Sequence, residues 1–363
     1  MTDILDRRAF IRRLLAMSAA GAAWGLAGCG SRPTPTATPA ITPVAPTRTL
    51  PPLATAIPPT TRASAATTSA PSSTVAPTTE PAAPIAAPTT ADAAYVAVAR
   101  GAGADPAELT RRAIAALGGI ERFVKPGADV IIKPNICNAY HGPEYASTTN
   151  PDVVAAIVAL CLGAGATRVR VMDFPFGGSA QAGYESSGIA AAVKAAGGEM
   201  DTMNRLKFNK TAIPQGKILR SSNIYSDILD ADTVINIPIA KTHGSATLTL
   251  GMKNLMGVIQ GRNALHARGL HQCIADLNSA VRPQLTVVDA YRMLMANGPT
   301  GGNLDDVKQA NTVIASADVV AADAYAATLF GMKPEAIGYI KLGAAMGLGT
   351  LDLKTLRIEE IAV

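Results

Sequence analysis

The sequence is poor in several residue types, and each scarcity excludes a class of protein. Only 16% of the 363 residues are charged, 4% are aromatic, and the four cysteines include no Cys-x-x-Cys pair. Cys29 lies near the start, which leaves Cys137, Cys161 and Cys273 for the rest of the chain. Three thiols cannot supply an all-cysteine iron–sulfur cluster, which needs four. An odd number without close pairs also argues against a disulfide framework; Cys161, within an apolar run, reads as a small core residue.

Positive charge is also scarce once the chain is divided by composition. Residues 1–28 carry a net charge of +2 and residues 29–93 carry +1, which leaves +2 of the total of +5 for residues 94–363. The sequence pI of about 9.0 is therefore mainly a property of the N-terminal segments. Because nucleic-acid binding depends on clustered positive charge, we expect no nucleic-acid partner.

The apolar run near the N-terminus, Leu14–Leu26, is shorter than the roughly 20 residues that span a bilayer. It follows Arg7-Arg8 and ends in Leu26-Ala27-Gly28-Cys29, which are the parts of a signal peptide. The start resembles a twin-arginine signal and the last four residues resemble a lipobox. This resemblance implies lipidation of Cys29. We expect residues 1–28 to be a signal peptide, and the mature protein to be anchored to the membrane through Cys29 at the extracytoplasmic face of the cell envelope.

Residues 29–93 consist almost entirely of proline, threonine, alanine and serine. Such a segment lacks the apolar side chains needed to offset the conformational entropy lost on folding, and its prolines remove backbone donors. The composition predicts a disordered linker, or stalk, between the anchor and the rest of the chain.

Residues 94–363 alternate between apolar, β-branched runs and helical patterns. Predicted strands cover 95–98, 129–132, 168–172, 233–237, 285–288 and an edge strand within 353–363; predicted helices cover 106–117, 151–162, 188–196, 270–281, 318–330 and 334–343. This alternation predicts an α/β fold, a mainly parallel sheet covered by helices. The length suits a single large domain, with room for a subdomain between 200 and 275.

Polar residues follow four of the predicted strands. They are Lys133 with Asn135, Asp173, Lys241 with His243, and Asp289. Because ligands of open parallel sheets bind outside the carboxyl ends of the strands, this recurrence favours a binding site there. Taken singly, Asp173 and Asp289 are also compatible with helix caps or turn residues.

Several sequence blocks resemble the domain of unknown function 362 family. They are Lys133-Pro134-Asn135, Thr148-Thr149-Asn150-Pro151, Ala164–Val169, Val234–Pro238, Lys241-Thr242-His243, Gly251-Met252-Lys253-Asn254-Leu255-Met256-Gly257, Val288-Asp289-Ala290, Gly298–Gly302 and Asp318–Asp323. The resemblance extends over nearly all of residues 94–330 and implies a fold and a site without an agreed activity. Some members of the family carry a ferredoxin-like segment, which this chain lacks.

One hypothesis for these blocks is a site for a small anionic molecule. Lys133, Lys241 and Lys253 would supply cations, with Asn135 and Asn254 as further donors. The glycines Gly298 and Gly301 would let backbone N–H groups approach a ligand, although the segment is equally compatible with a tight turn. A lysine in the half-apolar setting of Lys253 is a candidate base or nucleophile. No Walker loop, G-x-G-x-x-G after the first strand or G-x-S-x-G elbow is present.

The second hypothesis is a metal site. All four histidines lie near these blocks, and His243, His266 and His271 are the candidate ligands, with Asp173 or Asp289 as a carboxylate; the fourth is His141. His266 and His271 are five residues apart and cannot share one helical face as an i, i+4 pair does. The alternative is that the histidines are loop residues that form hydrogen bonds.

Two functions are therefore carried forward. One is an enzyme that acts on a small anionic molecule or a bound cofactor, with Lys241, His243, Lys253 and Asp289 at its site. The other is a non-catalytic binding lipoprotein that presents a ligand or a metal to a membrane partner. The sequence does not identify a cofactor. Both depend on one spatial prediction, that Lys133, Lys241, His243 and Lys253 meet in a single pocket.

Overall fold

The computed structural model of the chain describes residues 95–363. The predicted signal peptide (1–28), the predicted linker (29–93) and the predicted lipidation site Cys29 lie outside the described residues, so these expectations stay predictions. Within residues 95–363, no helix has both the length and the apolar character that crossing a membrane requires.

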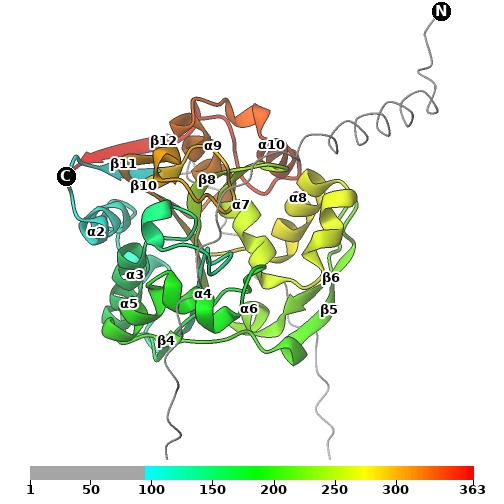
Figure 1. The fold of residues 1–363 in the computed structure, drawn as a ribbon, viewed down its shortest axis with the longest axis horizontal. Coiled ribbons are helices and arrows are strands. Elements are labelled where there is room, and N and C mark those ends of the chain that lie inside the picture. The colour runs from blue at the N-terminus through cyan, green and yellow to red at the C-terminus, as the bar shows by residue number, and fades with distance from the viewer. Residues whose placement is uncertain (1–94) are drawn as a thin grey trace, which may run out of the picture. The chain divides into compact units, whose positions relative to one another are not determined.

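A ten-stranded sheet forms the centre of the described chain (Figure 1). Its main path runs β12-β1-β11-β10-β7-β2-β3-β4, and β8 pairs with β10 and β9 beside this path. All neighbours on the main path are parallel except at β11, which is antiparallel to both β1 and β10. The strands are β1 (Tyr95–Arg100), β2 (Asp129–Pro134), β3 (Arg168–Val171), β4 (Glu199–Met200), β7 (Thr233–Ile237), β8 (Ile239–His243), β9 (Thr247–Thr249), β10 (Leu285–Leu294), β11 (Val307–Ser316) and β12 (Arg357–Ala362). The predicted α/β class with a mainly parallel sheet is confirmed.

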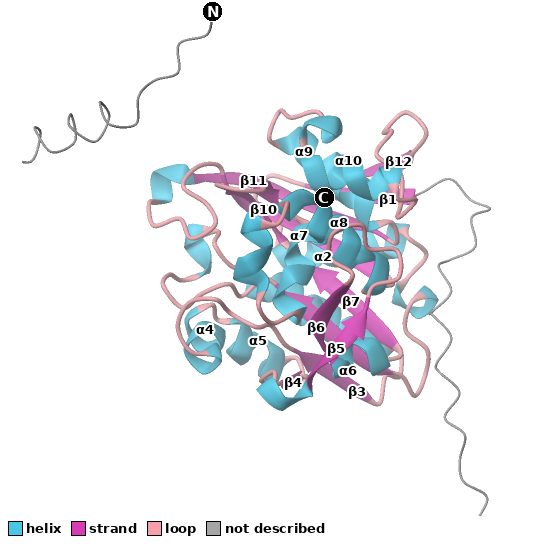
Figure 2. Cartoon of the chain, turned by 90° about the vertical axis from the view of Figure 1, so that its right-hand side faces the viewer, coloured by secondary structure: helices cyan, strands magenta, loops and turns pink. Residues whose placement is uncertain are grey.

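Helices cover both faces of this sheet (Figures 1 and 2). One hydrophobic core lies under α2, α3 and α5, and the other lies under α7, α8, α9 and α10. The helices are α2 (Pro106–Ala116), α3 (Pro151–Gly163), α4 (Ala180–Ser186), α5 (Ile189–Ala195), α6 (Ser226–Asp230), α7 (Gly251–Asn254), α8 (Leu270–Ala280), α9 (Val319–Leu329) and α10 (Gly338–Ala345). Short 3₁₀ turns, among them η3 (Arg205–Lys207), η4 (Leu255–Val258) and η5 (Arg262–Ala267), connect these elements.

The two cores explain why β2 reads as an unbroken apolar run. Val130 and Ile132 belong to the core under α2 and α3, whereas Ile131 belongs to the core on the opposite face. Side chains alternate along a strand, so a strand buried on both faces needs apolar residues at every position. The same covered sheet buries Cys161 of α3 fully, as its apolar surroundings predicted.

Several parts of the fold differ from the predicted elements. Lys241 and His243 were expected after a strand, but both lie inside β8. The strand predicted at 285–288 continues to Leu294, so Asp289 lies inside β10 and not after it. Strand β11, which is antiparallel, and the separate hairpin of β5 (Phe208–Ala212) and β6 (Ser221–Tyr225) were not predicted. The hairpin lies within residues 200–275, where the sequence left room for a subdomain.

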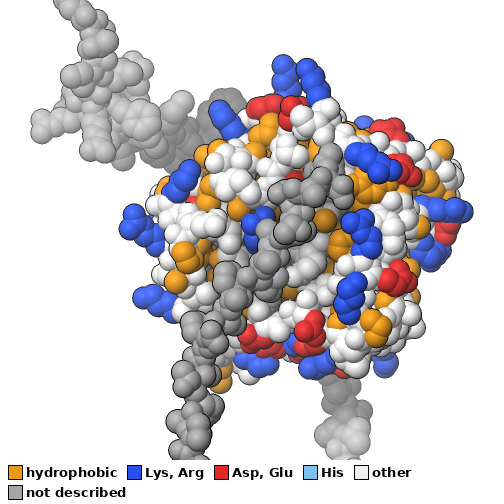
Figure 3. All heavy atoms as spheres, turned by 180° about the vertical axis from the view of Figure 1, so that it is seen from behind, with side chains coloured by type: hydrophobic (Ala, Val, Ile, Leu, Met, Phe, Trp, Pro, Cys, Tyr) orange, Lys and Arg blue, Asp and Glu red, His pale blue; other side chains and the backbone are white. Residues whose placement is uncertain are grey.

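The surface of the described residues carries charges of both signs. On the face seen in Figure 3, lysine and arginine side chains lie among aspartate and glutamate side chains. Two lysines, Lys133 and Lys241, are instead almost completely buried in the interior.

Candidate functional site

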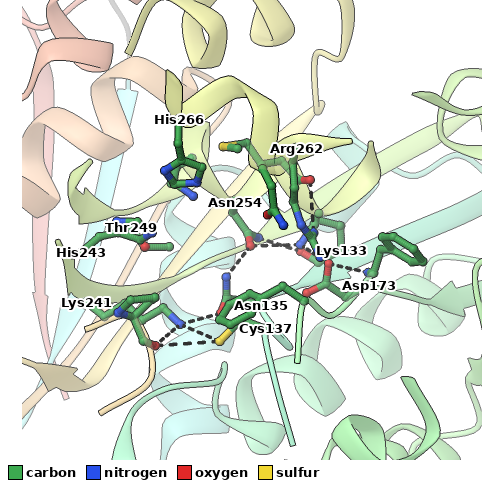
Figure 4. Close-up of a pocket in the computed structure, with 17 residues that line it drawn as sticks. Lys133, Asn135, Cys137, Asp173, Lys241, His243, Thr249, Asn254, Arg262 and His266 are labelled. Carbon is green, nitrogen blue, oxygen red and sulfur yellow. Dashed lines mark hydrogen bonds and ion pairs between the residues drawn. The ribbon is translucent and has the colours of Figure 1, made fainter. Parts of the chain in front are cut away.

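A cavity of about 270 Å³ lies beyond the carboxyl ends of β2 and β3 and beside β8 (Figure 4). Its walls come from five segments of the chain, namely the end of β2 with the residues that follow it, the segment after β3, the β8–β9 hairpin, the turns from α7 to η5, and the loop after β10. The lining residues are Lys133, Asn135, Cys137, Asp173, Phe174, Phe176, Lys241, His243, Thr249, Lys253, Asn254, Met256, Gly257, Arg262, Asn263, His266 and Pro299. The four residues expected to share one pocket, Lys133, Lys241, His243 and Lys253, all line it.

Backbone alternation positions two of these walls. Lys133, Asn135 and Cys137 occupy every second position of the chain and all line the cavity, as expected where successive side chains point to opposite sides. In the β8–β9 hairpin, Lys241 is paired directly with Thr249, and both line the cavity. The pocket is thus built on strands and their immediate continuations, which are rigid supports.

Lys133 is neutralised inside the protein. Its Nζ lies 2.7 Å from Oδ1 of Asp173, and both side chains are almost completely buried. Burial lowers the pKa of Lys133, and the carboxylate of Asp173 opposes that shift. The other oxygen of Asp173 accepts from the Ile136 N–H at 2.6 Å. Asp173 therefore fixes the segment after β2 and cancels the charge of Lys133.

Asn254 connects this ion pair to the rest of the pocket. Its Oδ1 accepts from Nζ of Lys133 at 3.0 Å and from Nδ2 of Asn135 at 2.9 Å, while its own amide donates to Asn236 at 2.8 Å. The Oδ1 of Asn135 in turn accepts from Nζ of Lys241 at 2.9 Å. The two buried lysines are thus linked through two amides, which fixes the distance between them.

The N-terminus of α7, which carries Lys253 and Asn254, is held by a buried carboxyl group. Asp323 of α9 accepts from the N–H groups of Gly251 at 2.6 Å and Met252 at 2.9 Å. Burial raises the pKa of Asp323 to about 8, although these two N–H groups oppose the shift. Carboxyl oxygens at a helix N-terminus accept from N–H donors that have no partner within the helix, so Asp323 anchors the wall that presents Lys253.

Gly257 in η4 allows the wall to approach the ion pair closely. A Cβ at this position would lie 2.1 Å from Oδ1 of Asp173 and 2.6 Å from Nζ of Lys133. Both contacts are far shorter than carbon approaches such atoms, so a side chain here requires the buried pair to move. This explains the second glycine of the Gly251–Gly257 block.

Lys241 is completely buried, and its contacts differ from those of Lys133. Its Nζ donates to Asn135 and to the carbonyl oxygens of Ser147 and Pro299, the last at 3.0 Å, and it lies 3.2 Å from Sγ of Cys137. Among the described residues it has no ion pair with a carboxylate. This part of the pocket therefore carries a positive charge that Asp173 does not cancel.

Lys253 and Arg262 add two more cations, and neither has an ion pair within residues 95–363. Burial, followed by the charges of Lys241 and Arg262, lowers the pKa of Lys253 to about 7. Burial also lowers the pKa of Arg262. The guanidinium of Arg262 lies over the Phe174 ring at 5.4 Å from its centre, an arrangement that orients its planar donors.

The two histidines of the pocket form a neutral pair. The rings of His243 and His266 are stacked at 6.1 Å, and Oγ of Ser245 lies 3.4 Å from one Nδ1 and 3.0 Å from the other. Burial, followed by the charge of Lys253, lowers the pKa of His243 to about 3; the pKa of His266 is also lowered. Both rings are therefore uncharged at neutral pH and add no positive charge to the pocket.

Several predicted site residues lie elsewhere. Asp289 is buried within β10, where it accepts from the N–H groups of Asn150 and Tyr291 and does not line the cavity. The N–H of Gly298 donates to Thr242 and that of Gly301 to Asn297, so both are used within the protein. The loop contributes the Pro299 carbonyl instead.

His271 and His141 also lie away from the cavity, His271 against Tyr339 and His141 against Tyr145. In the part of the chain that the structure describes, no group of three histidine, cysteine, aspartate or glutamate side chains is arranged to hold a metal ion. His243 and His266 are the pair of predicted metal candidates that the structure brings together.

Among the pocket residues that the sequence did not single out are Cys137, Arg262, Phe174 and Thr249. Cys137 had a detectable signal, because it continues the two-residue spacing of Lys133 and Asn135. The other three have none in the sequence alone. Arg262 and Phe174 meet only through the packing of η5 against the segment after β3.

The fold and the site define an α/β protein with a cationic pocket beyond the carboxyl ends of parallel strands. The family model for domain of unknown function 362 matches residues 130–328, more than half of the chain. The chain belongs to this family, as the sequence blocks indicated. Every wall of the pocket comes from within the matched range.

The chain is similar to a thylakoid-associated protein of Synechocystis sp., with 29% identity over 252 residues that cover 64% of this chain and 72% of the relative. Among solved structures, a Thermotoga maritima protein covers 63% of this chain at a TM-score of 0.40 and 11% identity. The lactate racemase apoprotein from Thermoanaerobacterium thermosaccharolyticum covers 53% at a TM-score of 0.35 and 12% identity. The matches span 60% and 50% of the lengths of these two structures.

Proposed function

We propose that the pocket binds a small anionic molecule through a carboxylate or phosphate group. The observation that carries this proposal is an imbalance of charge. Lys133, Lys241, Lys253 and Arg262 line one cavity with a single carboxylate, which is already paired with Lys133. Buried charges are normally paired, so three remaining cations around one cavity favour an anionic ligand.

Geometry supports a ligand of a few heavy atoms. The cavity of about 270 Å³ lies just below the roughly 300–1,000 Å³ that is common for ligand pockets. Arg262 offers parallel N–H donors that match the two oxygens of a carboxylate or phosphate, and Lys253 offers a compact charge. Phe174 and Met256 supply apolar wall for a short carbon skeleton.

An enzyme is favoured over a passive binding protein by Lys253. With a pKa of about 7, its amine exchanges a proton near neutral pH, which an ordinary surface lysine does not. Lys253 is then the proton acceptor or donor for the bound anion, while His243 and His266 remain neutral hydrogen-bonding groups. The alternative is a binding protein that presents its cargo to a membrane partner, for which Lys253 would serve as a ligand contact alone.

Isothermal titration calorimetry with oxalate and inorganic phosphate, and with neutral oxamide as a control ligand, tests the proposal. We expect an anion to bind and oxamide not to bind. Arg262→Gln should weaken binding about tenfold, since a charge-assisted hydrogen bond contributes about 1.5–3 kcal/mol. Arg205→Gln is the matched control, because Arg205 lies over the same Phe174 ring at 5.5 Å but outside the cavity. Equal binding by wild type and Arg262→Gln would contradict the proposal.

The natural ligand is best sought on protein purified after export. Native mass spectrometry combined with elemental analysis would detect a stoichiometric small molecule or metal in the pocket. A bound metal without an anion would favour the alternative function, whereas a carboxylate or phosphate compound would support the one proposed.

We also propose that the protein is exported by the twin-arginine route and tethered through lipidated Cys29. The support is the order Arg7-Arg8, apolar run, Leu26-Ala27-Gly28-Cys29 in the sequence. Cys29→Ser should release the protein from the membrane fraction, and replacing Arg7 and Arg8 together by lysine should prevent export. Membrane association of the Cys29→Ser variant equal to wild type, measured by fractionation and immunoblotting, would argue against the tether.

A further inference from the structure

The β8–β9 hairpin presents two uncharged hydrogen-bonding side chains to the pocket, Thr249 and His243. Lys241 and His243 are two positions apart on β8, so their side chains point to the same face of the hairpin. Thr249 is paired with Lys241 across the hairpin, and all three residues line the cavity. Figure 4 shows Thr249 and His243 toward one end of the pocket and Arg262 toward the other. The hairpin therefore meets a different part of a ligand from the part that Arg262 contacts.

Thr249 supplies a buried hydroxyl that has no partner within the protein. The residue is 3% exposed, and its Oγ1 forms no hydrogen bond with any other described residue. A hydroxyl removed from water is costly unless it is hydrogen-bonded, and most buried polar groups of native proteins have a partner. Thr286 also has a buried Oγ1 without a partner among the described residues, but it lies outside the cavity. Of these two hydroxyls, a ligand in the pocket can reach only that of Thr249.

His243 supplies a donor whose position on the ring is fixed by the backbone. Its Nδ1 accepts from the N–H groups of Ser245 at 3.2 Å and Ala246 at 3.3 Å, so this nitrogen carries no proton. The ring is uncharged at neutral pH, because burial and the charge of Lys253 lower its pKa to about 3. The single proton of the neutral imidazole is then on Nε2. Within residues 95–363 the hydrogen bonds of the ring all involve Nδ1, which leaves the Nε2–H as a free donor.

Lys241, which lies between these two side chains, has no donor left for a ligand. Its Nζ already donates to oxygens of Asn135, Ser147 and Pro299, and a lysine nitrogen carries at most three N–H bonds. Direct hydrogen bonds from the hairpin to a ligand therefore come from uncharged groups. Such groups suit an uncharged oxygen, whereas a carboxylate or phosphate is better matched by the cations Lys253 and Arg262.

We propose that Thr249 and His243 form a subsite for an uncharged oxygen of the anionic ligand, so that the ligand is a small acid that also carries a hydroxyl or a carbonyl group. This rests on the proposed anion site, in which Lys253 and Arg262 hold the acidic group. The uncharged oxygen accepts from the Nε2–H of His243 and forms a second hydrogen bond with Oγ1 of Thr249, which can donate or accept. The two residues are diagonal neighbours in an antiparallel pair, about 7–8 Å apart, so both side chains can contact one oxygen.

Calorimetry on the purified full chain with a set of four-carbon acids tests the subsite. Butyrate, 2-hydroxybutyrate, 3-hydroxybutyrate and 2-oxobutyrate share one carboxylate and one carbon skeleton, and butyrate alone lacks the uncharged oxygen. At least one of the other three should bind about tenfold more tightly than butyrate, because butyrate leaves the hydrogen-bonding groups of the site unpaired. The proposal is overturned if all three bind no more tightly than butyrate, or if none of them binds. This comparison needs no variant.

Variants assign the preference to the named residues. Thr249→Val removes the hydroxyl and keeps the branched shape, so the preferred acid should then bind no more tightly than butyrate, whereas Thr249→Ser should keep the preference. His243→Phe keeps a ring without a donor and should weaken the preference. Thr286→Val is the matched control, because it removes a buried, unpartnered hydroxyl outside the cavity and should leave the preference unchanged. A full preference in a Thr249→Val variant that folds by circular dichroism would overturn the role of Thr249.

A neutral ligand separates this inference from the proposed anion site. The primary amide of the acid that binds best keeps the uncharged oxygen and lacks the charge, so it should bind at least about tenfold more weakly than the acid. Equal binding of this amide and its acid, with the preference over butyrate intact, would keep the subsite and reject the anion site. Oxalate binding without any preference over butyrate would keep the anion site and reject the subsite.

Discussion

Lys133 and Lys241 are both buried and line the same pocket, but the groups around them differ. Lys133 pairs with the carboxylate of Asp173 at 2.7 Å. Lys241 contacts three neutral oxygens and the sulfur of Cys137. Asn135 lies between them and links the two sides through Asn254. Asp173 therefore balances the charge of Lys133, while no carboxylate of the described residues balances that of Lys241.

This difference separates structural from chemical roles in residues of the same type. An ion pair such as Lys133–Asp173 has little left to offer a ligand, because each charge already has its partner. A buried cation surrounded by carbonyls can stabilise an anion that forms or binds beside it. We infer that the Lys133 side holds the walls in place and that the Lys241 side, with Lys253 and Arg262, meets the ligand.

The largest expected effect comes from removing Asp173, the ion-pair partner of Lys133. Asp173→Ala leaves Lys133 buried without a partner and should lower the free energy of unfolding by about 3–5 kcal/mol, as for other broken buried pairs. Lys241→Met removes hydrogen bonds to neutral groups and should cost less, about 1–3 kcal/mol. Urea denaturation of both variants measures the difference.

A double variant provides the control for this prediction. Lys133→Met together with Asp173→Leu removes both charges and should recover part of the stability lost in Asp173→Ala, since no buried charge is then left alone. If Asp173→Ala cost no more than Lys241→Met, the two sides of the pocket would not differ as inferred.

The next effect concerns the close approach of η4 to the ion pair. Gly257→Ala places a methyl group 2.1 Å from Asp173 and 2.6 Å from Lys133, and should destabilise the protein by about 1–3 kcal/mol through overpacking. Gly163→Ala at the end of α3 is the control, because nothing lies within 4 Å of its Cβ. A thermal melt in which Gly257→Ala equals wild type would mean that the buried pair can move freely.

The fold could be predicted from the sequence where a single physical pattern determines the secondary structure. Strand β2 and helix α3 are visible because a sheet covered on both faces needs apolar strands, and because Asn150 and Pro151 start the helix as a cap and a first turn. Strand β11 was missed because its first half contains the exposed polar residues Lys308 and Gln309 and because its pairing is antiparallel. Local composition does not determine such pairing.

The site was predictable in its residue types and less so in its partners. Lys133 and Lys241 were expected together because polar residues that follow parallel strands meet at one edge, and Lys253 was expected beside them from the Gly251–Gly257 block. Asp289 was placed in the site by the same rule, yet its strand continues past it to Leu294 and buries it. Arg262 shows the limit of the rule, since a 3₁₀ turn brings it to the pocket through tertiary packing alone.

A third prediction concerns the positive charge of Lys253, which lies on the same side of the pocket as Lys241. Because the pKa of Lys253 is about 7, its positive charge is present at pH 6 and largely lost at pH 8.5. Oxalate, a dianion over this range, should bind about tenfold more weakly at pH 8.5, since one charge-assisted hydrogen bond is lost. Calorimetry at the two pH values measures this change.

Two variants of Lys253 serve as controls for this prediction. Lys253→Arg keeps its charge and should bind oxalate equally at both pH values, whereas Lys253→Met should bind weakly at both. A wild-type affinity independent of pH would show that Lys253 does not contact the anion. His243 cannot produce the effect, because its pKa of about 3 leaves it neutral throughout.

The smallest effect is expected at Asp289, the carboxylate that sequence grouped with Asp173 and the structure separates from it. Asp289→Asn should leave oxalate affinity unchanged, because the side chain lies outside the cavity and bonds to backbone N–H groups. Burial raises the pKa of Asp289 to about 6, so the folded state binds its proton more tightly than the unfolded state does. Stability from this group is present at low pH and falls as pH rises from about 4 through 6.

Asparagine resembles the protonated carboxyl, so the variant should lack this part of the pH dependence. The difference in free energy of unfolding between wild type and Asp289→Asn, measured by urea denaturation at pH 4 and pH 7, should therefore shift in favour of the variant as pH rises. A difference that shifts the other way would mean that the two backbone N–H groups outweigh burial. A loss of oxalate binding would instead show that Asp289 belongs to the site, and would weaken the distinction between the Lys133 side and the Lys241 side of the pocket.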